Sequence, residues 1–199
     1  HNLPFQRCAT LGTAANMNNA AICIERFCDL EVVTVCTGGV EGNAGRAGDP
    51  ATYYEPQDDS AKGQIDLECE RRPGTINAMI FLNRELTPGA MVTAVITATE
   101  AKTAALQELA VGSKYSEGLA TGTGTDQIAV ASKLGGKAIS FAGKHSKVGE
   151  LIGRTMHDAV LETLALQNGL TAAGQCSSLA HLERLGTDSR EMCQGIGEF

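Results

Sequence analysis

Residues 31–37 read Glu31-Val-Val-Thr-Val-Cys-Thr37, and residues 74–82 read Gly74-Thr-Ile-Asn-Ala-Met-Ile-Phe-Leu82. β-Branched residues dominate the first stretch, which predicts a buried strand that ends at the glycine pair after it. The second stretch barely alternates between apolar and polar residues, which is typical of a strand buried on both faces. We expect both strands to lie in one sheet and to decide the fold.

Two long helices are predicted after these strands. The first begins at Pro88 with Thr87 as its N-cap and runs to about Leu109, because apolar residues recur at helical spacing. The second begins after the N-cap Ser146 and ends at Gly169, a residue type that favours the left-handed conformation after a helix. The face of the first helix that is expected to pack carries Met91, Val95, Ala98, Lys102, Ala105 and Leu109.

Shorter segments complete the expected order of elements. Residues 16–27 are compatible with a helix, residues 128–132 and 138–141 with short strands, and residues 179–185 with a last short helix. Strands that alternate with long helices predict an α/β or α+β class. We expect a single layered domain over residues 1–199, in which long helices pack on a central mixed sheet.

Composition excludes several classes of protein. The chain has 199 residues, of which 43% are hydrophobic and 20% charged, so wholesale disorder is excluded. A net charge of −7, no cluster of Lys or Arg, and 4% aromatic residues without Trp argue against a nucleic-acid partner. No apolar run reaches the roughly 20 residues that cross a bilayer, so no membrane span is expected.

The seven cysteines point to a reducing compartment. Their number is odd and no CxxC pair is present, which favours buried reduced thiols in a cytosolic protein over a disulfide framework. No spacing of Cys and His is typical of zinc, so no metal site is expected.

Polar loops punctuated by glycine recur at residues 37–50, 120–126 and 143–147. Loops on a rigid scaffold often carry binding groups. The stretch Thr121-Gly-Thr-Gly-Thr125 can cradle an anion with its backbone amides, but it lacks the Walker spacing and lysine and fits a plain tight turn equally well. A phosphate-binding nucleotide enzyme would rest on this loop alone.

Five blocks in this order resemble the adenosylcobinamide amidohydrolase family: TGGVEGNAGRAGDP (37–50), GTIN (74–77), TATEAKTAALQEL (97–109), ATGTGTD (120–126) and GKHSKVGELIGR (143–154). The resemblance implies a cytoplasmic hydrolase of corrinoid salvage. Such an enzyme cleaves the aminopropanol amide of adenosylcobinamide, or the equivalent amide of adenosylpseudocobalamin, and releases adenosylcobyric acid. It implies no cofactor, since the corrinoid is the substrate. We expect the family's N-terminal stretch before the first block to be missing from this chain.

Amide hydrolysis requires a base, donors for the oxyanion and an acid for the leaving amine. His145 is the candidate base, because it precedes a long helix whose N-terminal dipole favours a neutral imidazole; a capping or surface role is the alternative. Glu100 is expected to activate water or to orient His145, with an exposed surface role as the alternative. Asp126 is expected to orient the imidazole, with an Asx turn as the alternative.

Amide, carboxylate, hydroxyl and ammonium groups suit the primary amides at the corrin periphery and the product carboxylate. We expect the substrate to be bound by Asn43, Arg46, Asp49, Asn77, Thr123, Thr125 and Lys144, whose alternative roles are turns and surface charges. Thr75, Thr123 and Thr125 each follow a glycine, so a nucleophilic threonine is an alternative to His145.

The sequence therefore predicts an amidohydrolase whose loops 37–50 and 120–126 hold the corrinoid and shape the oxyanion site. A non-catalytic corrinoid-binding module is the alternative, although the chain has no DxHxxG-type signature for a cobalt ligand. Assembly into a homo-oligomer is compatible with both hypotheses.

Overall fold

The computed structural model describes residues 4–51, 54 and 74–175. Two short 3-10 helices, Phe5–Arg7 and Met17–Asn19, precede the first strand. The remaining elements are β1 (Ala21–Phe27), β2 (Leu30–Gly39), β3 (Ala44–Gly45), β4 (Thr75–Leu82), α1 (Pro88–Glu108), β5 (Gly122–Thr123), β6 (Gln127–Ser132) and α2 (Lys147–Asn168).

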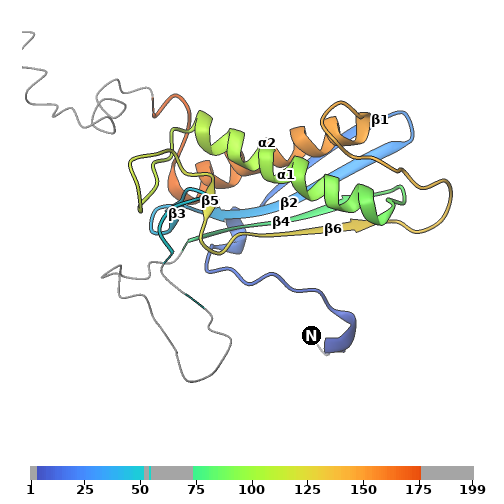
Figure 1. The fold of residues 1–199 in the computed structure, drawn as a ribbon, viewed down its shortest axis with the longest axis horizontal. Helices are drawn as coiled ribbons and strands as arrows, with labels where there is room; N and C mark the ends of the chain where they lie inside the picture. The colour runs from blue at the N-terminus through green and yellow to red at the C-terminus, as the bar shows by residue number, and fades with distance from the viewer. Residues whose placement is uncertain (1–3, 52–53, 55–73, 176–199) are drawn as a thin grey trace, which may run out of the picture.

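A four-stranded mixed sheet and two helices form two layers (Figure 1). The strand order is β1-β2-β4-β6, in which β1, β2 and β4 are antiparallel neighbours and β6 runs parallel to β4. Both helices lie on the same face of the sheet, with α2 over β1 and β2 and α1 beside β6. The predicted mixed α/β layers are confirmed, as is the prediction that residues 31–37 and 74–82 form strands of one sheet.

The core lies between the sheet and the helices. Cys36 pairs with Ala21 of β1 and Ala78 of β4, which puts it at the centre of the sheet, on the face that the helices cover. Thr34 and Thr155 are fully buried in this layer, and their hydroxyls share a hydrogen bond of 2.8 Å. Polar groups in the core are thus satisfied by one another, as burial requires.

Three expectations for the short segments have different outcomes. Residues 21–27 are not helical but form β1, because every residue pairs with β2 through a tight turn at Cys28 (φ 53°). Residues 138–141 form no strand; Ile139 makes a single bridge to Leu86. The short helix expected near residues 179–185 lies outside the described residues.

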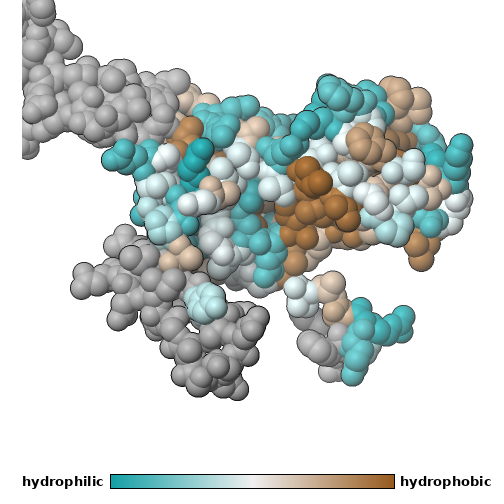
Figure 2. All heavy atoms as spheres, viewed as in Figure 1, coloured by the Kyte–Doolittle hydropathy of each residue, from teal (hydrophilic) through white to brown (hydrophobic). Residues whose placement is uncertain are grey.

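Helix α1 packs largely through small residues, and the expected face is confirmed at Ala98, Lys102, Ala105 and Leu109 but is wrong at Val95. Val95 is exposed, whereas the alanines at 90, 94, 98 and 105 are fully buried. Small side chains let a helix approach its neighbours closely, and here they outweigh the larger apolar residues. Figure 2 shows apolar side chains gathered over α1, where Val92, Val95 and Ile96 are exposed. Lys102 does lie on the buried face, as the helical spacing predicts.

Neither α1 nor α2, the two α-helices of the described residues, covers the second face of the sheet. Phe81 of β4 is 43% exposed there, so the expectation that this strand is buried on both faces is wrong at its end. The N-terminal residues run beneath this face (Figure 1), and the Asn77 side-chain amide donates to the Gly12 carbonyl at 2.6 Å. No helix within the described ranges is both long and apolar enough to cross a membrane.

Candidate functional site

The loop at 120–126 ends in a carboxylate that four donors hold. Asp126 Oδ1 accepts from the Ile76 backbone amide at 2.9 Å and from the Thr123 hydroxyl at 2.6 Å. Asp126 Oδ2 accepts from the Thr123 backbone amide at 3.0 Å and forms an ion pair with the Lys102 ammonium. We call Lys102, Thr123 and Asp126 the threonine–aspartate–lysine cluster.

The ion pair of this cluster is buried. The side chains of Lys102 and Asp126 are 8% and 11% exposed. A Cβ atom at Gly122 would lie 2.3 Å from Asp126 Oδ2 and 2.6 Å from Lys102 Nζ, so the backbone of β5 packs directly against the pair. Buried charges of this kind are stable only when paired and hydrogen-bonded, and both conditions are met here.

Hydroxyl and amide groups join this loop to the start of β4. The Thr125 hydroxyl and the Asn43 side-chain amide both donate to the Gly74 carbonyl, at 2.9 and 3.1 Å. The Thr75 hydroxyl donates to the Thr125 carbonyl at 2.8 Å. Tyr115 donates to Asn43 Oδ1 at 2.7 Å. Asn43, Thr125 and Thr75 therefore join the loops 37–50 and 120–126 to the start of β4 beside the cluster.

Asp49 and Arg46 hold the neighbouring loops together. Asp49 accepts from the hydroxyls of Ser113 and Ser116 and from the Arg46 backbone amide, each at 2.6 Å. Desolvation raises the pKa of Asp49, but these hydrogen bonds together bring it below its usual value. The Arg46 guanidinium donates to the Leu119 carbonyl at 3.1 Å. Both residues therefore join the loop at 46–49 to residues 113–119. Their binding of substrate stays a prediction.

The side-chain oxygen of Asn77 is a buried hydrogen-bond acceptor. Its side chain is buried beside the N-terminal segment, and Asn77 Oδ1 has no hydrogen-bond partner among the described residues. A buried amide oxygen without a partner is costly and is satisfied when a ligand brings a donor. The side chain lies on the sheet face opposite to the helices, where it contacts Gly12, and the binding of substrate by Asn77 stays a prediction.

The nearest buried thiol is not available as a nucleophile. Burial raises the pKa of Cys36 to about 12, and the Asp126 charge adds to this effect while Lys102 opposes it. A thiol with this pKa carries almost no thiolate at neutral pH. Among the described cysteines Cys36 is buried, but Cys8 and Cys28 are exposed, so the expectation of buried thiols is wrong for these two.

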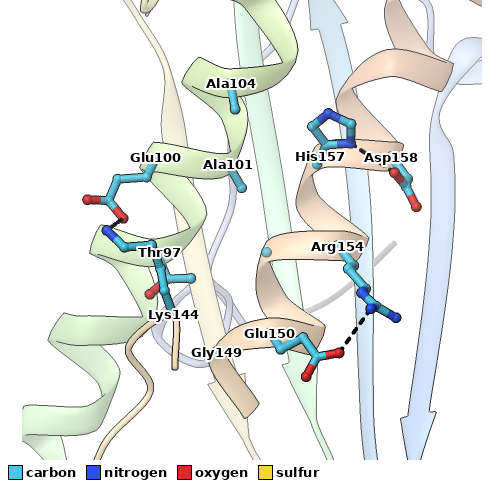
Figure 3. Close-up of a pocket in the computed structure, with 11 residues that line it drawn as sticks. Thr97, Glu100, Ala101, Ala104, Lys144, Gly149, Glu150, Arg154, His157 and Asp158 are labelled. Atoms are coloured by element: carbon cyan, nitrogen blue, oxygen red, sulfur yellow. Dashed lines mark hydrogen bonds and ion pairs between the residues drawn. The ribbon is translucent and has the colours of Figure 1, made fainter. Parts of the chain in front are cut away.

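A second candidate place is an open cavity of about 460 Å³ between α1 and α2 (Figure 3). Its floor consists of small residues, Ala101, Ala104, Gly149 and Gly153. Charged side chains around it are mostly paired: Lys144 with Glu100 at 2.6 Å and Arg154 with Glu150 at 3.1 Å. The volume suits a small ligand or one arm of a larger one.

His157 of α2 lines this cavity. Its ring nitrogens contact Asp158 at 2.9 Å and Glu108 at 3.0 Å. Partial burial lowers the pKa of His157, but the two carboxylates outweigh burial and bring it above the usual value. Glu108 belongs to α1, so the imidazole links the two helices, which the sequence spacing does not reveal.

The three predicted catalytic residues do not meet in this cavity. Glu100 lines it and is paired with Lys144, whereas Asp126 lies in the threonine–aspartate–lysine cluster. Glu100 is exposed on α1 and Lys102 is buried, so they occupy different faces of the same helix. His145 is exposed next to Lys144, and its ring has no hydrogen-bond partner within the described part of the chain.

The described residues contain no group of three or more His, Cys, Asp or Glu side chains that could hold a metal ion. Lys102 is the residue of the site that the sequence reasoning missed as a functional candidate. Its signal was a lysine within the buried face of a helix, where a lysine needs a partner.

Comparison with known proteins shows which family the sequence resembles. The adenosylcobinamide amidohydrolase family model matches residues 1–172. An uncharacterised protein of Methanocaldococcus jannaschii is 40% identical over an alignment of 163 residues, and the match covers 80% of this chain. The matched part is 64% of that relative, so the chain spans just under two thirds of its length. Since the family match covers most of the sequence, the chain belongs to the adenosylcobinamide amidohydrolase family.

Proposed function

We propose that this protein hydrolyses the aminopropanol amide of adenosylcobinamide, or the equivalent amide of adenosylpseudocobalamin, and releases adenosylcobyric acid. The reaction is the hydrolysis of a linear C–N bond on a corrinoid side chain, and it serves the salvage of cobalamin precursors. Family membership supports the reaction class, and the geometry of the loops supports a location for it.

The observation that carries the proposal is the meeting of four family blocks at one end of the sheet. Asn43 from block 37–50 contacts Gly74, which opens block 74–77. Asp126 from block 120–126 contacts Ile76 and pairs with Lys102 from block 97–109. Sequence blocks that are far apart thus build one polar centre on a rigid sheet, as a binding site requires.

The chemistry available at this centre suits amide hydrolysis. Asp126 lies within hydrogen-bond distance of the Thr123 hydroxyl, so a carboxylate is placed to take a proton from a reacting oxygen. We propose that Asp126 is the catalytic carboxylate among the three predicted residues. The loops 37–50 and 120–126 would bind the peripheral amides of the corrinoid, together with Asn77, whose Oδ1 has no partner within the described part of the chain.

His145 and Glu100 form the competing assignment. In it, the exposed imidazole takes a proton from water, and Glu100, which is paired with Lys144, orients it at the cavity between the helices. In this assignment Asp126 does not orient the imidazole of His145, contrary to the expectation from the sequence. The two assignments predict different mutants to be inactive.

The experiment is to incubate the purified protein with adenosylcobinamide and to follow adenosylcobyric acid and free aminopropanol by mass spectrometry. We expect both products in equal amounts. Asp126→Asn should lower kcat by about 10²–10⁴-fold, which is the range of general acid–base catalysis. Asp29→Asn is the matched control, because this exposed aspartate pairs with Arg84 near the β1–β2 turn.

Three other outcomes would support a different conclusion. If His145→Ala loses activity to a comparable extent and Asp126→Asn stays active, the catalytic residues are His145 and Glu100 at the cavity between the helices. Corrinoid binding, seen as a change in its visible absorption, without any product would support a non-catalytic binding module. If the protein neither binds the corrinoid nor forms product, the proposed function is contradicted.

A further inference from the structure

We propose that Thr123 is the nucleophile of the reaction and forms a covalent ester with the corrinoid acyl group, and that Lys102 positions Asp126 to take its proton. This inference rests on the proposed function. It deepens that function by assigning the attacking atom and a positioning residue.

Among Thr75, Thr123 and Thr125, Thr123 is the residue whose hydroxyl contacts a carboxylate. Thr123 Oγ1 donates to Asp126 Oδ1 at 2.6 Å. Thr75 and Thr125 instead donate to the backbone carbonyls of Thr125 and Gly74, at 2.8 and 2.9 Å. A carboxylate is a far stronger base than a backbone carbonyl oxygen, and a nucleophile next to a base is the arrangement that covalent catalysis needs.

Thr123 is also reachable. Its residue is half-buried, whereas Thr75 is 7% exposed and Cys36, the nearby thiol, is fully buried and protonated. Because its hydroxyl proton points to Asp126, a lone pair of Thr123 Oγ1 remains free to attack. The Thr125 backbone amide reaches the same oxygen at 3.3 Å and helps to hold it.

Lys102 acts through Asp126. The carboxylate is only 11% exposed, and a buried charge is stable at a given place when an opposite charge fixes it there. Lys102 reaches Asp126 Oδ2, which leaves Oδ1 for the Thr123 hydroxyl and the Ile76 amide. The lysine thereby determines which carboxylate oxygen faces the nucleophile.

The reaction balances in two steps. Thr123 Oγ bonds to the amide carbonyl carbon, its proton moves to Asp126, and the C–N bond breaks as aminopropanol leaves with that proton. Water then cleaves the ester, which releases the corrinoid carboxylic acid and restores the threonine hydroxyl and the ionised carboxylate. The net change is one amide and one water to one acid and one amine.

The experiment is to mix the whole chain with adenosylcobinamide, quench it in acid within one turnover, and measure the intact mass. We expect an adduct equal to the substrate minus aminopropanol, on the peptide that contains Thr123. Neutral hydroxylamine added during turnover should divert part of the product to the corrinoid hydroxamate, because hydroxylamine cleaves esters.

Matched variants separate chemistry from folding. Thr123→Val keeps the shape but removes the hydroxyl, and it should lose the adduct and lower kcat about 10³-fold or more, while Thr123→Ser should keep both within about tenfold. Thr99→Val is the control, since this exposed hydroxyl only contacts its own helix. Lys102→Met should lower the rate of adduct formation about 10²-fold with KM within about threefold, and Lys102→Arg should recover part of it.

The outcomes are decisive in either direction. If the wild type makes product but Thr123→Val keeps its kcat within about threefold and no adduct or hydroxamate forms, the nucleophile assignment is refuted and the proposed function stands. If Lys102→Met changes KM and the melting temperature but leaves the rate of adduct formation intact, its positioning role is refuted. If the wild type makes no product at all, both proposals fail together.

Discussion

Gly122→Ala tests how tightly the threonine–aspartate–lysine cluster is built. The new methyl group would lie 2.3 Å from Asp126 Oδ2 and 2.6 Å from Lys102 Nζ, distances that no Cβ atom tolerates. Asp126 has little room to move, because four donors hold it. The substitution must therefore either push the carboxylate away from its donors or separate the ion pair.

The cost follows from these two ways of relieving the contact. Forcing one methyl group into a packed site costs about 1–3 kcal/mol. Breaking a buried ion pair costs about 3–5 kcal/mol. Since the pair is displaced rather than deleted, we expect the free energy of unfolding to fall by about 2–4 kcal/mol. At roughly 2–4 °C per kcal/mol for a chain of this size, the melting temperature should fall by about 4–16 °C.

The assay is urea unfolding followed by far-ultraviolet circular dichroism, combined with calorimetry and turnover of adenosylcobinamide. Gly112→Ala is the control, because nothing lies within 4 Å of a Cβ atom there, and it should stay within about 0.5 kcal/mol of the wild type. A Gly122→Ala protein with wild-type stability and turnover would refute the picture of a rigid, closely packed cluster.

Three further predictions concern metals, pH and thiols. Turnover should survive EDTA and dialysis, and a loss that a stoichiometric transition metal restores would contradict the metal-independent mechanism. The raised pKa of His157 means that its carboxylate contacts stabilise the fold below about pH 6.5 and cease to do so as the pH rises through the folded-state value. The melting temperature of His157→Gln should therefore trail the wild type at about pH 6 and approach it at about pH 9, as a pH series of thermal scans would reveal. Iodoacetamide should modify Cys8 and Cys28 of the native protein and spare Cys36, which peptide mapping can check.

The long elements could be predicted from the sequence because their signals are local. The Thr87 side chain caps α1, the Ser146 side chain caps α2, and Gly169 ends α2 with φ 65°. The run of β-branched residues in β2 is equally local. Such signals need no knowledge of the partners of a segment.

Strand β1 could not be predicted in the same way. Ile22, Cys23 and Ile24 form an apolar run that suits a helix or a strand, and the pairing with β2 decides between them. Tertiary context overrides local propensity in such segments.

In the candidate site, too, the features that depend on local sequence could be predicted and those that depend on tertiary packing could not. Its loops and most of its residues were expected, since glycine, threonine and asparagine mark turns and polar contacts. The ion pair between Lys102 and Asp126 joins a helix to a loop 24 residues later, and no local pattern reports it. The separation of Glu100 from Asp126 likewise depends on how far α1 is rotated about its axis when it packs.

The two small strands β3 and β5 determine when during folding this centre can exist. β1 and β2 are joined by a two-residue turn, so their contacts close a short loop and can form early. Ala44 pairs with Thr123, and the chain between them includes β4 and α1. This pairing therefore closes a long loop, which costs the chain more conformational entropy than the β1–β2 turn does. The polar centre can therefore form only once segments that are far apart in the sequence have come together. A ligand that bridges the loops would stabilise the native state through these long-range contacts, because a ligand that binds only the native state shifts the folding equilibrium toward it.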